Sequence, residues 1–235
     1  MQKGKLYLIP ASLGENTTHT IPQYVIDQTH QLDEFIVERA KTARRYLKAL
    51  KTPVPFNQMT FHELNKRTTP SELNHFLDNA ERGKDIGLLS EAGCPGVADP
   101  GAEIVALAHR KGIEVIPFVG PSSILLALMA SGMNGQNFAF VGYIGMKKPE
   151  RVKDLKRLEQ NAQRFNQTQI FIETPYRNNG LIQEALQTLK PNTKLCIAAD
   201  LTLPTQYIKT LTVQQWKKTT LPDLHKRLAL FLIYR

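Results

Sequence analysis

Residues 90–101 read SEAGCPGVADPG, and the interpretation of the whole chain starts from them. They follow a short apolar run, Ile86–Leu89, that is typical of a buried strand. Three glycines and two prolines fall within nine residues, and these residue types permit or impose unusual backbone angles. The pattern predicts a shaped loop at the carboxyl end of a strand, where open α/β sheets bind ligands. An ordinary strand-to-helix turn is the alternative interpretation.

A second loop of the same kind follows in residues 120–123 (GPSS). It separates an expected strand, 114–119 (EVIPFV), from an expected helix, 124–131 (ILLALMAS). Serines just before an apolar helix are N-cap candidates, and free amides there favour polar or anionic groups. Capping and ligand contact are compatible, so both interpretations stay open. Gly93 and Gly120 are expected to let a ligand approach the backbone in the two loops.

The two loops, followed by a helix of small apolar residues, resemble the tetrapyrrole methylase superfamily, and within it the small-subunit rRNA (cytidine-2′-O)-methyltransferases. Three further stretches match in the same order: GKLYLI at 4–9, TFHELN at 60–65 and IFIETPYR at 170–177. The resemblance covers nearly the whole chain. It implies an α/β fold of two domains, 1–119 and 120–235, with a parallel sheet in the first and a mixed sheet in the second. It also implies that S-adenosylmethionine binds in the cleft between the domains.

The resemblance further implies which residues contact this cofactor. They belong to the three loops after strands of the first domain and to strand ends of the second: Leu13, Cys94, Pro95, Val97, Ser123, Ile124, Ile172, Glu173, Ala199 and Ala229. Most contacts would come from backbone atoms. Core packing is an equally good explanation of the apolar members.

Methyl transfer from a sulfonium needs mainly proximity and alignment, and a ribose hydroxyl also needs a base nearby. Glu38, His62 and Glu91 are the candidates for base or substrate-orienting roles. Imidazole titrates near neutral pH, although a single histidine in a loop is more often an ordinary hydrogen-bonding residue. Glu63 and Asn65 are expected to hold that loop. No set of side chains shows metal-ligand spacing.

Two motifs depart from the family pattern. The first loop, TPIGNLxD in the family, reads PASLGEN at 10–16, and the EDTR element reads ERAK at 38–41. These departures leave two other hypotheses open. One is a methylase of a tetrapyrrole or another small acceptor, and the other is a cofactor-binding protein without catalysis.

The net charge of +9 is confined to the second half of the chain. Residues 1–120 hold 14 Lys or Arg against 14 Asp or Glu, whereas residues 121–235 hold 16 against 7. This asymmetry favours a polyanionic partner, here ribosomal RNA or the small ribosomal subunit, and solubility is the alternative explanation. Lys147, Lys148, Arg151 and Lys153 crowd one loop and helix start, so they are expected to contribute most to RNA binding.

Composition bounds the cellular setting. Cys94 and Cys196 lie far apart and do not form a disulfide framework, which fits a reducing cytoplasm. The first residues show no apolar signal segment. Glycine and proline interrupt the uncharged stretch 115–146, so it reads as buried strand, loop and helix rather than a membrane span. The resemblance implies a homodimer.

Alternating strand and helix patterns favour mostly parallel pairing. Strands are expected at 5–9, 34–37, 86–89, 114–119, 139–143, 169–173, 195–199, 207–212 and 228–234, with antiparallel pairing suggested for the last two. Helices are expected at 22–31, with Thr20 as cap, and at 39–50, 73–82 (entered through a helix-start signal at 69–72 with proline near N1), 102–111, 124–131, 149–166 and 181–189. No GxGxxG follows the first strand, which argues against the common dinucleotide-binding fold.

Overall fold

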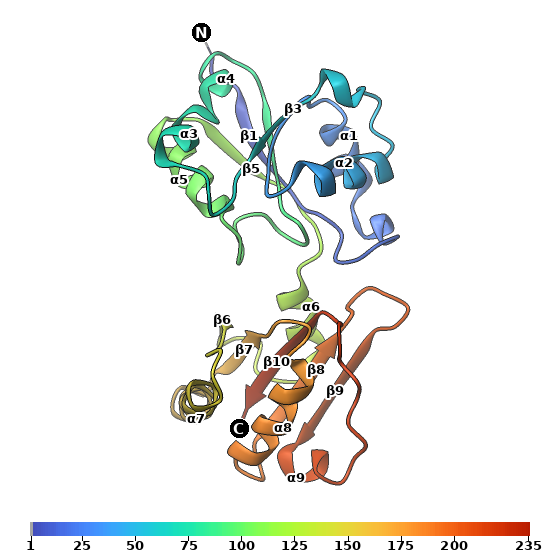
Figure 1. Ribbon diagram of the computed structural model, residues 1–235, viewed down its shortest axis with the longest axis vertical. Helices are drawn as coiled ribbons and strands as arrows, with labels where there is room; N and C mark the ends of the chain where they lie inside the picture. The colour runs from blue at the N-terminus through green and yellow to red at the C-terminus, as the bar shows by residue number, and fades with distance from the viewer. Residues whose placement is uncertain (1) are drawn as a thin grey trace. The chain divides into compact units, whose positions relative to one another are not determined.

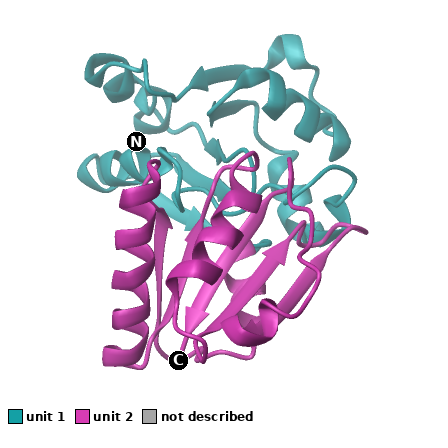
Figure 2. Cartoon of the chain, turned by 60° about the horizontal axis from the view of Figure 1, so that its bottom comes forward, with its two compact units in different colours: residues 1–122 teal, residues 123–235 magenta. Residues whose placement is uncertain are grey.

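The computed structural model describes residues 2–235, and the chain divides into two compact units, 1–122 and 123–235 (Figures 1 and 2). Each unit has its own five-stranded sheet. The predicted α/β class, with one parallel and one mixed sheet, is confirmed. The predicted domains, 1–119 and 120–235, stay a prediction, because a compact unit is not by that fact an independently folding one.

The sheet of unit 1 is wholly parallel, with the strand order β3-β2-β4-β1-β5. In chain order its strands are β1 (Lys5–Ile9), β2 (Glu34–Val37), β3 (Thr60–Glu63), β4 (Ile86–Leu89) and β5 (Glu114–Pro117). Helices cover both faces (Figure 1). One face carries α1 (Gln23–Thr29) and α2 (Ala40–Ala49), and the other carries α3 (Pro70–His75), α4 (Asp78–Glu81) and α5 (Gly101–Arg110).

Alternation of side chains along each strand builds the two cores of unit 1. In β2, Phe35 and Val37 join the core beneath α1 and α2, whereas Ile36 joins the core beneath α3, α4 and α5. All four residues of β4 are buried. A strand covered on both faces must be apolar throughout, which is why these strands read as continuous apolar runs.

The neighbouring strands β1 and β4 send the chain to opposite faces of the sheet. After β1 the chain continues to α1, which packs into one core, and after β4 it continues to α5, which packs into the other. In open α/β sheets such a reversal opens a crevice at the carboxyl ends of the two strands. The loops 10–16 and 90–101 follow these two strands, so they lie at the edge of the sheet where open α/β folds usually bind ligands.

The sheet of unit 2 is mixed, with the order β6-β7-β10-β8-β9. Its strands are β6 (Phe138–Tyr143), β7 (Thr168–Ile172), β8 (Lys194–Ala199), β9 (Tyr207–Thr212) and β10 (Ala229–Tyr234). β6 and β7 are parallel, while β10 is antiparallel to β7 and β8, and β9 is antiparallel to β8. The last two strands are therefore antiparallel to their neighbours, as expected.

Helices also cover both faces of the second sheet. The main core lies beneath α7 (Lys148–Phe165) and α8 (Asn178–Thr188) and includes Trp216 from α9 (Val213–Trp216). On the other face α6 (Ser123–Ser131) packs against β8, β9 and β10, and the Thr210 hydroxyl donates to the Ser131 carbonyl at 2.8 Å. None of the helices within residues 2–235 is long and apolar enough to cross a membrane.

Three local expectations are wrong. Residues 60–63 form an edge strand rather than a loop, and their half-exposed, mixed polarity hid it. The helix expected at 73–82 is two helices, because Phe76 and Leu77 turn into the core between them. Pro22 rather than Thr20 precedes α1, with no side-chain cap.

Gly87 is a position where packing demands glycine. A Cβ added there would lie 2.7 Å from Phe35 Cδ1 and 2.8 Å from Ile9 Cδ1. We expect Gly87→Val to lower the free energy of unfolding by about 1–3 kcal/mol through overpacking. Gly180 on α8 has open space, so Gly180→Ala should raise it by about 0.4–1 kcal/mol. Urea denaturation measures both, and an unchanged midpoint for Gly87→Val would contradict this account of the core.

Candidate functional site

Three loops converge at the carboxyl edge of the sheet of unit 1. Ala11 N donates to Gly93 O at 2.9 Å, and Gly93 N donates to Ala11 O at 3.0 Å, which ties the loop after β1 to the loop after β4. The loop after β5 joins them, since Cys94 Sγ donates to Pro121 O at 3.6 Å. The loops that the sequence singled out are therefore neighbours in the structure.

Gly93 keeps space open between these loops. Its φ is +75°, and a Cβ added there would lie 3.4 Å from Leu13 Cδ2 and 3.5 Å from Pro121 O. Gly120 has a different explanation, because a Cβ there would lie 2.2 Å from Pro10 Cγ. The structure thus accounts for Gly120 by packing on Pro10 rather than by the approach of a ligand, which corrects the sequence-based expectation.

Asp99 fixes the shape of the loop after β4. Its Oδ1 accepts hydrogen bonds from Gly96 N and Gly101 N, both at 2.8 Å, and Gly101 is the first residue of α5. Burial raises the pKa of Asp99, although both amides work against that rise. The neighbouring Ala98 has a φ of +61°, a conformation that costs a residue other than glycine about 1–2 kcal/mol. Strain held in place by surrounding hydrogen bonds is typical of ligand-binding loops.

Glu38 and Glu91 come together beside this loop. Glu38 follows β2, and its Oε1 accepts a hydrogen bond from Glu91 N at 3.1 Å. Burial raises the pKa of Glu38, and the nearby charges of Asp99 and Glu91 add to that rise, while the bond from Glu91 N opposes it. A carboxylate with a raised pKa at a ligand-binding edge is suited to accept a proton.

His62, the third candidate, makes its contacts elsewhere. It lies on β3 and not in a loop, and its Nε2 is 2.9 Å from Glu34 Oε1, with its ring 5.2 Å from that of Phe76. Glu34 is buried at the start of β2, the edge opposite the three loops, where Asn79 and Lys84 also contact it. Burial alone would raise the pKa of Glu34, but the bonds from His62, Asn79 and Lys84 lower it.

Glu63 and Asn65 hold the chain near Glu38. Glu63 ends β3, and its Oε1 accepts a hydrogen bond at 2.7 Å from Ala40 N, the first residue of α2. Asn65 Oδ1 accepts from Arg67 N at 2.9 Å. Asn65 thus orders the turn after β3, whereas Glu63 does not hold a loop around His62, which lies on the strand, but fixes the helix that begins two residues after Glu38.

Four of the residues assigned to unit 2 by resemblance meet at one edge of its sheet. Ile172 ends β7, Glu173 follows it, Ala199 ends β8, and Ala229 begins the antiparallel β10 directly opposite Ala199. The other two, Ser123 and Ile124, begin α6. In unit 1, Leu13 is half-buried, Pro95 is buried and Val97 is exposed.

Glu173 leaves a polar atom without a partner at this edge. Its Oε1 accepts from Thr174 N and from Arg177 Nη2, whereas the buried Oε2 has no hydrogen-bond partner among the described residues. A buried acceptor in this condition is unusual in a folded protein, and Arg177 Nε beside it is likewise buried without a partner among the described residues. Motif matching alone pointed to Glu173, and only the structure shows which oxygen is available.

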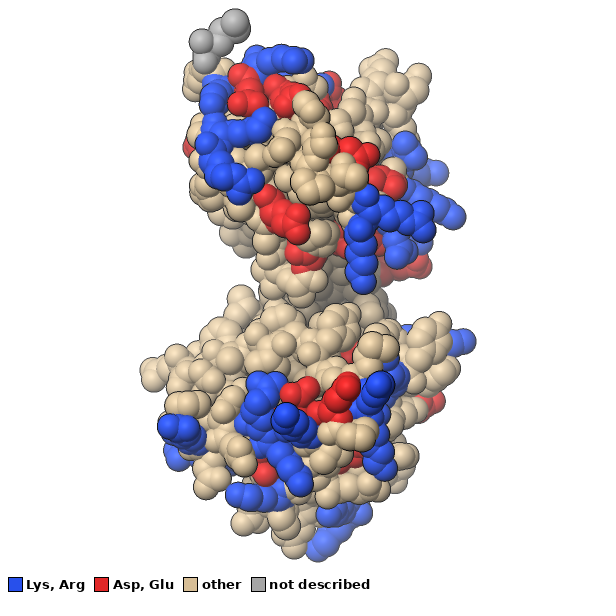
Figure 3. Space-filling view, turned by 60° about the vertical axis from the view of Figure 1, so that its left-hand side comes forward, with Lys and Arg blue, Asp and Glu red and all other residues tan. Residues whose placement is uncertain are grey.

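The basic start of α7 is only partly as expected. Arg151 binds Glu184 through Nε at 2.7 Å and Nη2 at 2.8 Å, so its guanidinium is already engaged, which removes it from the expected RNA contacts. Lys147, Lys148 and Lys153 are exposed and have no carboxylate within 4.0 Å among residues 2–235. Figure 3 shows Lys and Arg side chains over one face of unit 2, with a group of acidic side chains between them. Within residues 2–235, no cluster of His, Cys, Asp and Glu side chains could hold a metal ion.

Comparison with known proteins places this geometry in a family. The family model described as Tetrapyrrole (Corrin/Porphyrin) Methylases matches residues 26–216. A protein of Halalkalibacterium halodurans named ribosomal RNA small subunit methyltransferase I is 30% identical over 200 residues, which is 85% of this chain and 65% of that protein. Its namesake from Bacillus subtilis is 33% identical over 174 residues, 74% of this chain and 56% of that protein. The chain thus spans roughly two thirds or less of the length of these relatives.

Solved structures share the fold. The methyltransferase CobJ superposes with a TM-score of 0.64 at 18% identity, covering 99% of this chain and 94% of its own. The uroporphyrin-III C-methyltransferase of Thermus thermophilus, solved in complex with S-adenosyl homocysteine, superposes with a TM-score of 0.57 at 17% identity, covering 99% and 98%. At these identities the likeness is one of fold.

The raised pKa of Glu38 has a measurable consequence for stability. The folded protein holds the Glu38 proton more tightly than the unfolded chain, so the free energy of unfolding falls as pH rises from the ordinary glutamate pKa, about 4.3, through the higher folded value. We expect Glu38→Gln to be more stable than the native protein at pH 7 to 8, with the difference vanishing below about pH 4. Thermal melting over a pH series measures it.

His62→Ala is the contrasting variant. It removes a partner from the buried Glu34, so it should lower the free energy of unfolding at pH 7 by about 1–3 kcal/mol. For the first variant, a melting temperature of Glu38→Gln equal to that of the native protein at every pH would mean that Glu38 has no raised pKa. The description of the acidic pair would then be incorrect.

Proposed function

The chain belongs to the tetrapyrrole methylase family, and from this premise we propose that it is an S-adenosylmethionine-dependent methyltransferase that methylates ribose 2′-oxygens of small-subunit ribosomal RNA. The observation that carries the proposal is the convergence of three loops around Gly93, with Glu38 and Glu91 beside them. The printed names of the relatives from H. halodurans and B. subtilis support the choice of RNA as substrate. The excess of basic residues in 121–235 supports it independently.

The residues present fit the cofactor. Its amino-acid ammonium, ribose hydroxyls and adenine amine are hydrogen-bond donors, and the unpartnered Glu173 Oε2 is an acceptor. We assign the loop contacts in unit 1 to Leu13, Cys94, Pro95 and Val97. The proposed contacts in unit 2 are Ser123, Ile124, Ile172, Glu173, Ala199 and Ala229. When bound, the cofactor supplies an electrophilic methyl group on a sulfonium.

Glu38 is the residue proposed to take the proton of the ribose hydroxyl. Its carboxylate is half-buried, and the Glu91 amide fixes one oxygen, which leaves the other available. Burial raises its pKa, so the ionised form is a stronger base than an ordinary glutamate. The loops tied by Ala11 and Gly93 position the reactants, and alignment supplies most of the remaining rate.

Two alternatives stay in view. Arg39, Ala40 and Lys41 replace the family's residues after Glu38, which favours a changed acceptor, such as a tetrapyrrole, or binding of the cofactor without catalysis. An RNA substrate places the protein where ribosomes are, so we propose the cytoplasm as its location. The homodimer stays a prediction, and light scattering of the purified protein tests it.

Cofactor binding is tested first. We expect S-adenosylhomocysteine to bind with a Kd of roughly micromolar order in titration calorimetry. Gly93→Val should abolish binding, because two methyl groups would fill the space beside Leu13 and Pro121, and a φ of +75° is unfavourable for valine. Gly135→Ala is the matched control, since nothing lies within 4 Å of an added Cβ. Native affinity in Gly93→Val would move the site away from these loops.

The reaction is tested on ribosomal RNA. Mass spectrometry of RNA from a strain lacking this protein should show a missing ribose methyl group, and the purified protein should restore it. Glu38→Gln should lower kcat at least a hundredfold with the S-adenosylhomocysteine Kd unchanged. The native rate should rise with pH through the Glu38 pKa, because the base acts when ionised. Unchanged methylation in the deletion strain would favour a small acceptor, and full activity of Glu38→Gln would assign the base elsewhere.

A further inference from the structure

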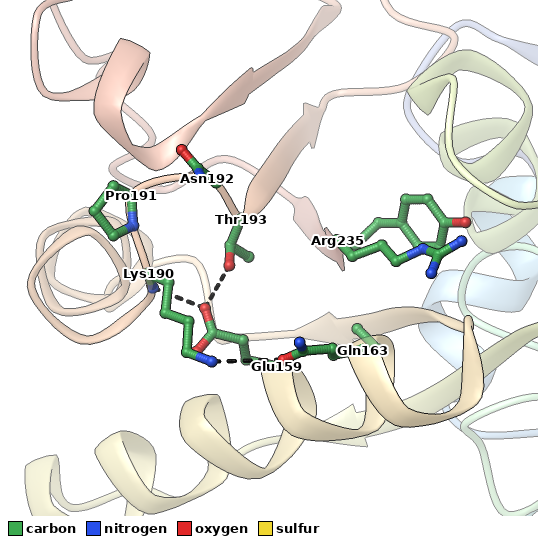
Figure 4. Close-up of a pocket in the computed structure, with 9 residues that line it drawn as sticks. Glu159, Gln163, Lys190, Pro191, Asn192, Thr193 and Arg235 are labelled. Carbon is green, nitrogen blue, oxygen red and sulfur yellow. Dashed lines mark hydrogen bonds between the residues drawn. The ribbon is translucent and has the colours of Figure 1, made fainter.

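Unit 2 has a hollow at the edge of its sheet opposite Ile172 and Ala199. Its volume is about 490 Å³ (Figure 4). It lies near the end of α7 and the end of β10, and the loop between α8 and β8 closes one side. The six residues of β10 separate it from the opposite edge by about 17 Å. It is therefore distinct from the edge assigned to the cofactor.

The walls of the hollow are held rigidly by hydrogen bonds. The buried Glu159 of α7 accepts from Lys190 N at 2.7 Å and from Thr193 Oγ1 at 2.5 Å, which fixes the loop above it (Figure 4). Across the hollow, the Tyr234 hydroxyl donates to Asn166 Oδ1. The one carboxylate side chain of the lining, that of Glu159, is thus satisfied by its own neighbours, and the shape does not depend on a ligand.

The cations around the hollow have no ionic partners. Lys190 and Arg235 line it, Lys194 Nζ lies 5.8 Å from the centre of the Tyr234 ring, and Arg164 lies at the end of α7. None of the four has a carboxylate within 4.0 Å among residues 2–235.

The arginines at this end of unit 2 differ from the other arginines of the unit in having no carboxylate partner among the described residues. Four of the six arginines of unit 2 are paired with carboxylates: Arg151, Arg157, Arg177 and Arg227. Of the two that remain, Arg235 lines the hollow and Arg164 lies in the last turn of α7, and each lies over a neighbouring aromatic ring. Because guanidinium groups usually take part in bidentate pairs when a carboxylate is at hand, two without a carboxylate at this end of the unit favour an external anion.

A strip of α7 leads to the hollow. The strip consists of exposed residues spaced three or four apart on one face of the helix: Lys153, Lys156, Gln160 and Arg164. None of these four residues is acidic. The helix has 18 residues, a length of about 26 Å, and begins beside Lys147. The positive field therefore continues beyond the hollow, which suits a chain of phosphates better than a single small anion.

We propose that this hollow binds backbone phosphates of the RNA on the side of the target nucleotide away from the methyl-transfer edge, with the exposed strip of α7 guiding the chain to it. The inference rests on the proposed function and adds a second contact region to it. Lys190 and Arg235 would contact phosphate oxygens, while Gln163 and Asn192 offer amide donors from the lining. Base stacking is not part of the proposal, since Lys194 and Arg235 already lie over the Tyr234 ring.

The test compares two double variants of the full chain. Lys190→Gln with Arg235→Gln neutralises the hollow. Lys48→Gln with Arg110→Gln is the matched control, because it removes one exposed lysine and one exposed arginine of unit 1 that have no ionic partner among residues 2–235. Fluorescence anisotropy with a small-subunit RNA fragment is measured over a salt series, with thermal melting and S-adenosylhomocysteine titration on each protein.

The expected result is specific to the hollow. Two lost phosphate contacts on a single strand should reduce the slope of log Kd against log salt by about 1.4 and raise Kd roughly tenfold near 0.1 M salt. Melting and S-adenosylhomocysteine affinity should stay as in the native protein. The control pair should keep the native slope.

Three outcomes would count against the ideas in different ways. If the native protein binds no RNA, the proposed function fails with its RNA substrate. If RNA binds and the hollow variant keeps the slope of the control, the phosphate site is refuted while the proposed function stands. If the native protein binds inorganic phosphate or adenosine monophosphate and only that binding is lost in the variant, the hollow holds a small phosphorylated ligand and the RNA proposal is overturned.

Discussion

The reciprocal hydrogen bonds between Ala11 and Gly93 are the constraint on which the organisation of unit 1 depends. They join the loops after β1 and β4, the two strands from which the chain departs to opposite faces of the sheet. Without this link the loops would be two independent turns. With it, the space at Gly93 is bounded by Leu13 and Pro121, and the strained Ala98 is held by the bonds of Asp99 to Gly96 and Gly101.

Local sequence patterns predict this arrangement well where neighbouring residues in the chain determine the structure. The central strands of unit 1 are apolar because helices cover both faces, so the run Ile86–Leu89 by itself predicts a strand. Glycine and proline after that strand predict the shaped loop, because Gly93 and Gly96 adopt positive φ angles. The acidic pair was half predictable. Glu38 and Glu91 were both candidates, but only tertiary contact shows that the amide of one binds the carboxylate of the other.

What the sequence could not predict depends on partners distant along the chain. His62 was expected in a loop, yet it lies on an edge strand against Glu34, 28 residues away. Arg151 was grouped with the free cations of α7, yet Glu184 engages it. Gly120 was attributed to a ligand, yet Pro10 occupies the space. Each error has one cause, which is that a residue type suited to two roles is assigned by its neighbours in space.

The ion pairs of unit 2 explain how its excess of basic residues is distributed in the structure. In unit 2 four carboxylates bind arginines, and the other three, Glu150, Glu159 and Asp223, accept hydrogen bonds from nearby amides or hydroxyls. No lysine of that unit has a carboxylate within 4.0 Å in the part of the chain that the structure describes. The carboxylates of unit 2 thus stabilise the unit itself, and most of them do so by binding an arginine. The planar guanidinium group suits such fixed pairs. The lysines remain as point charges without a carboxylate partner, the form of positive charge that suits a flexible polyanion without demanding one geometry.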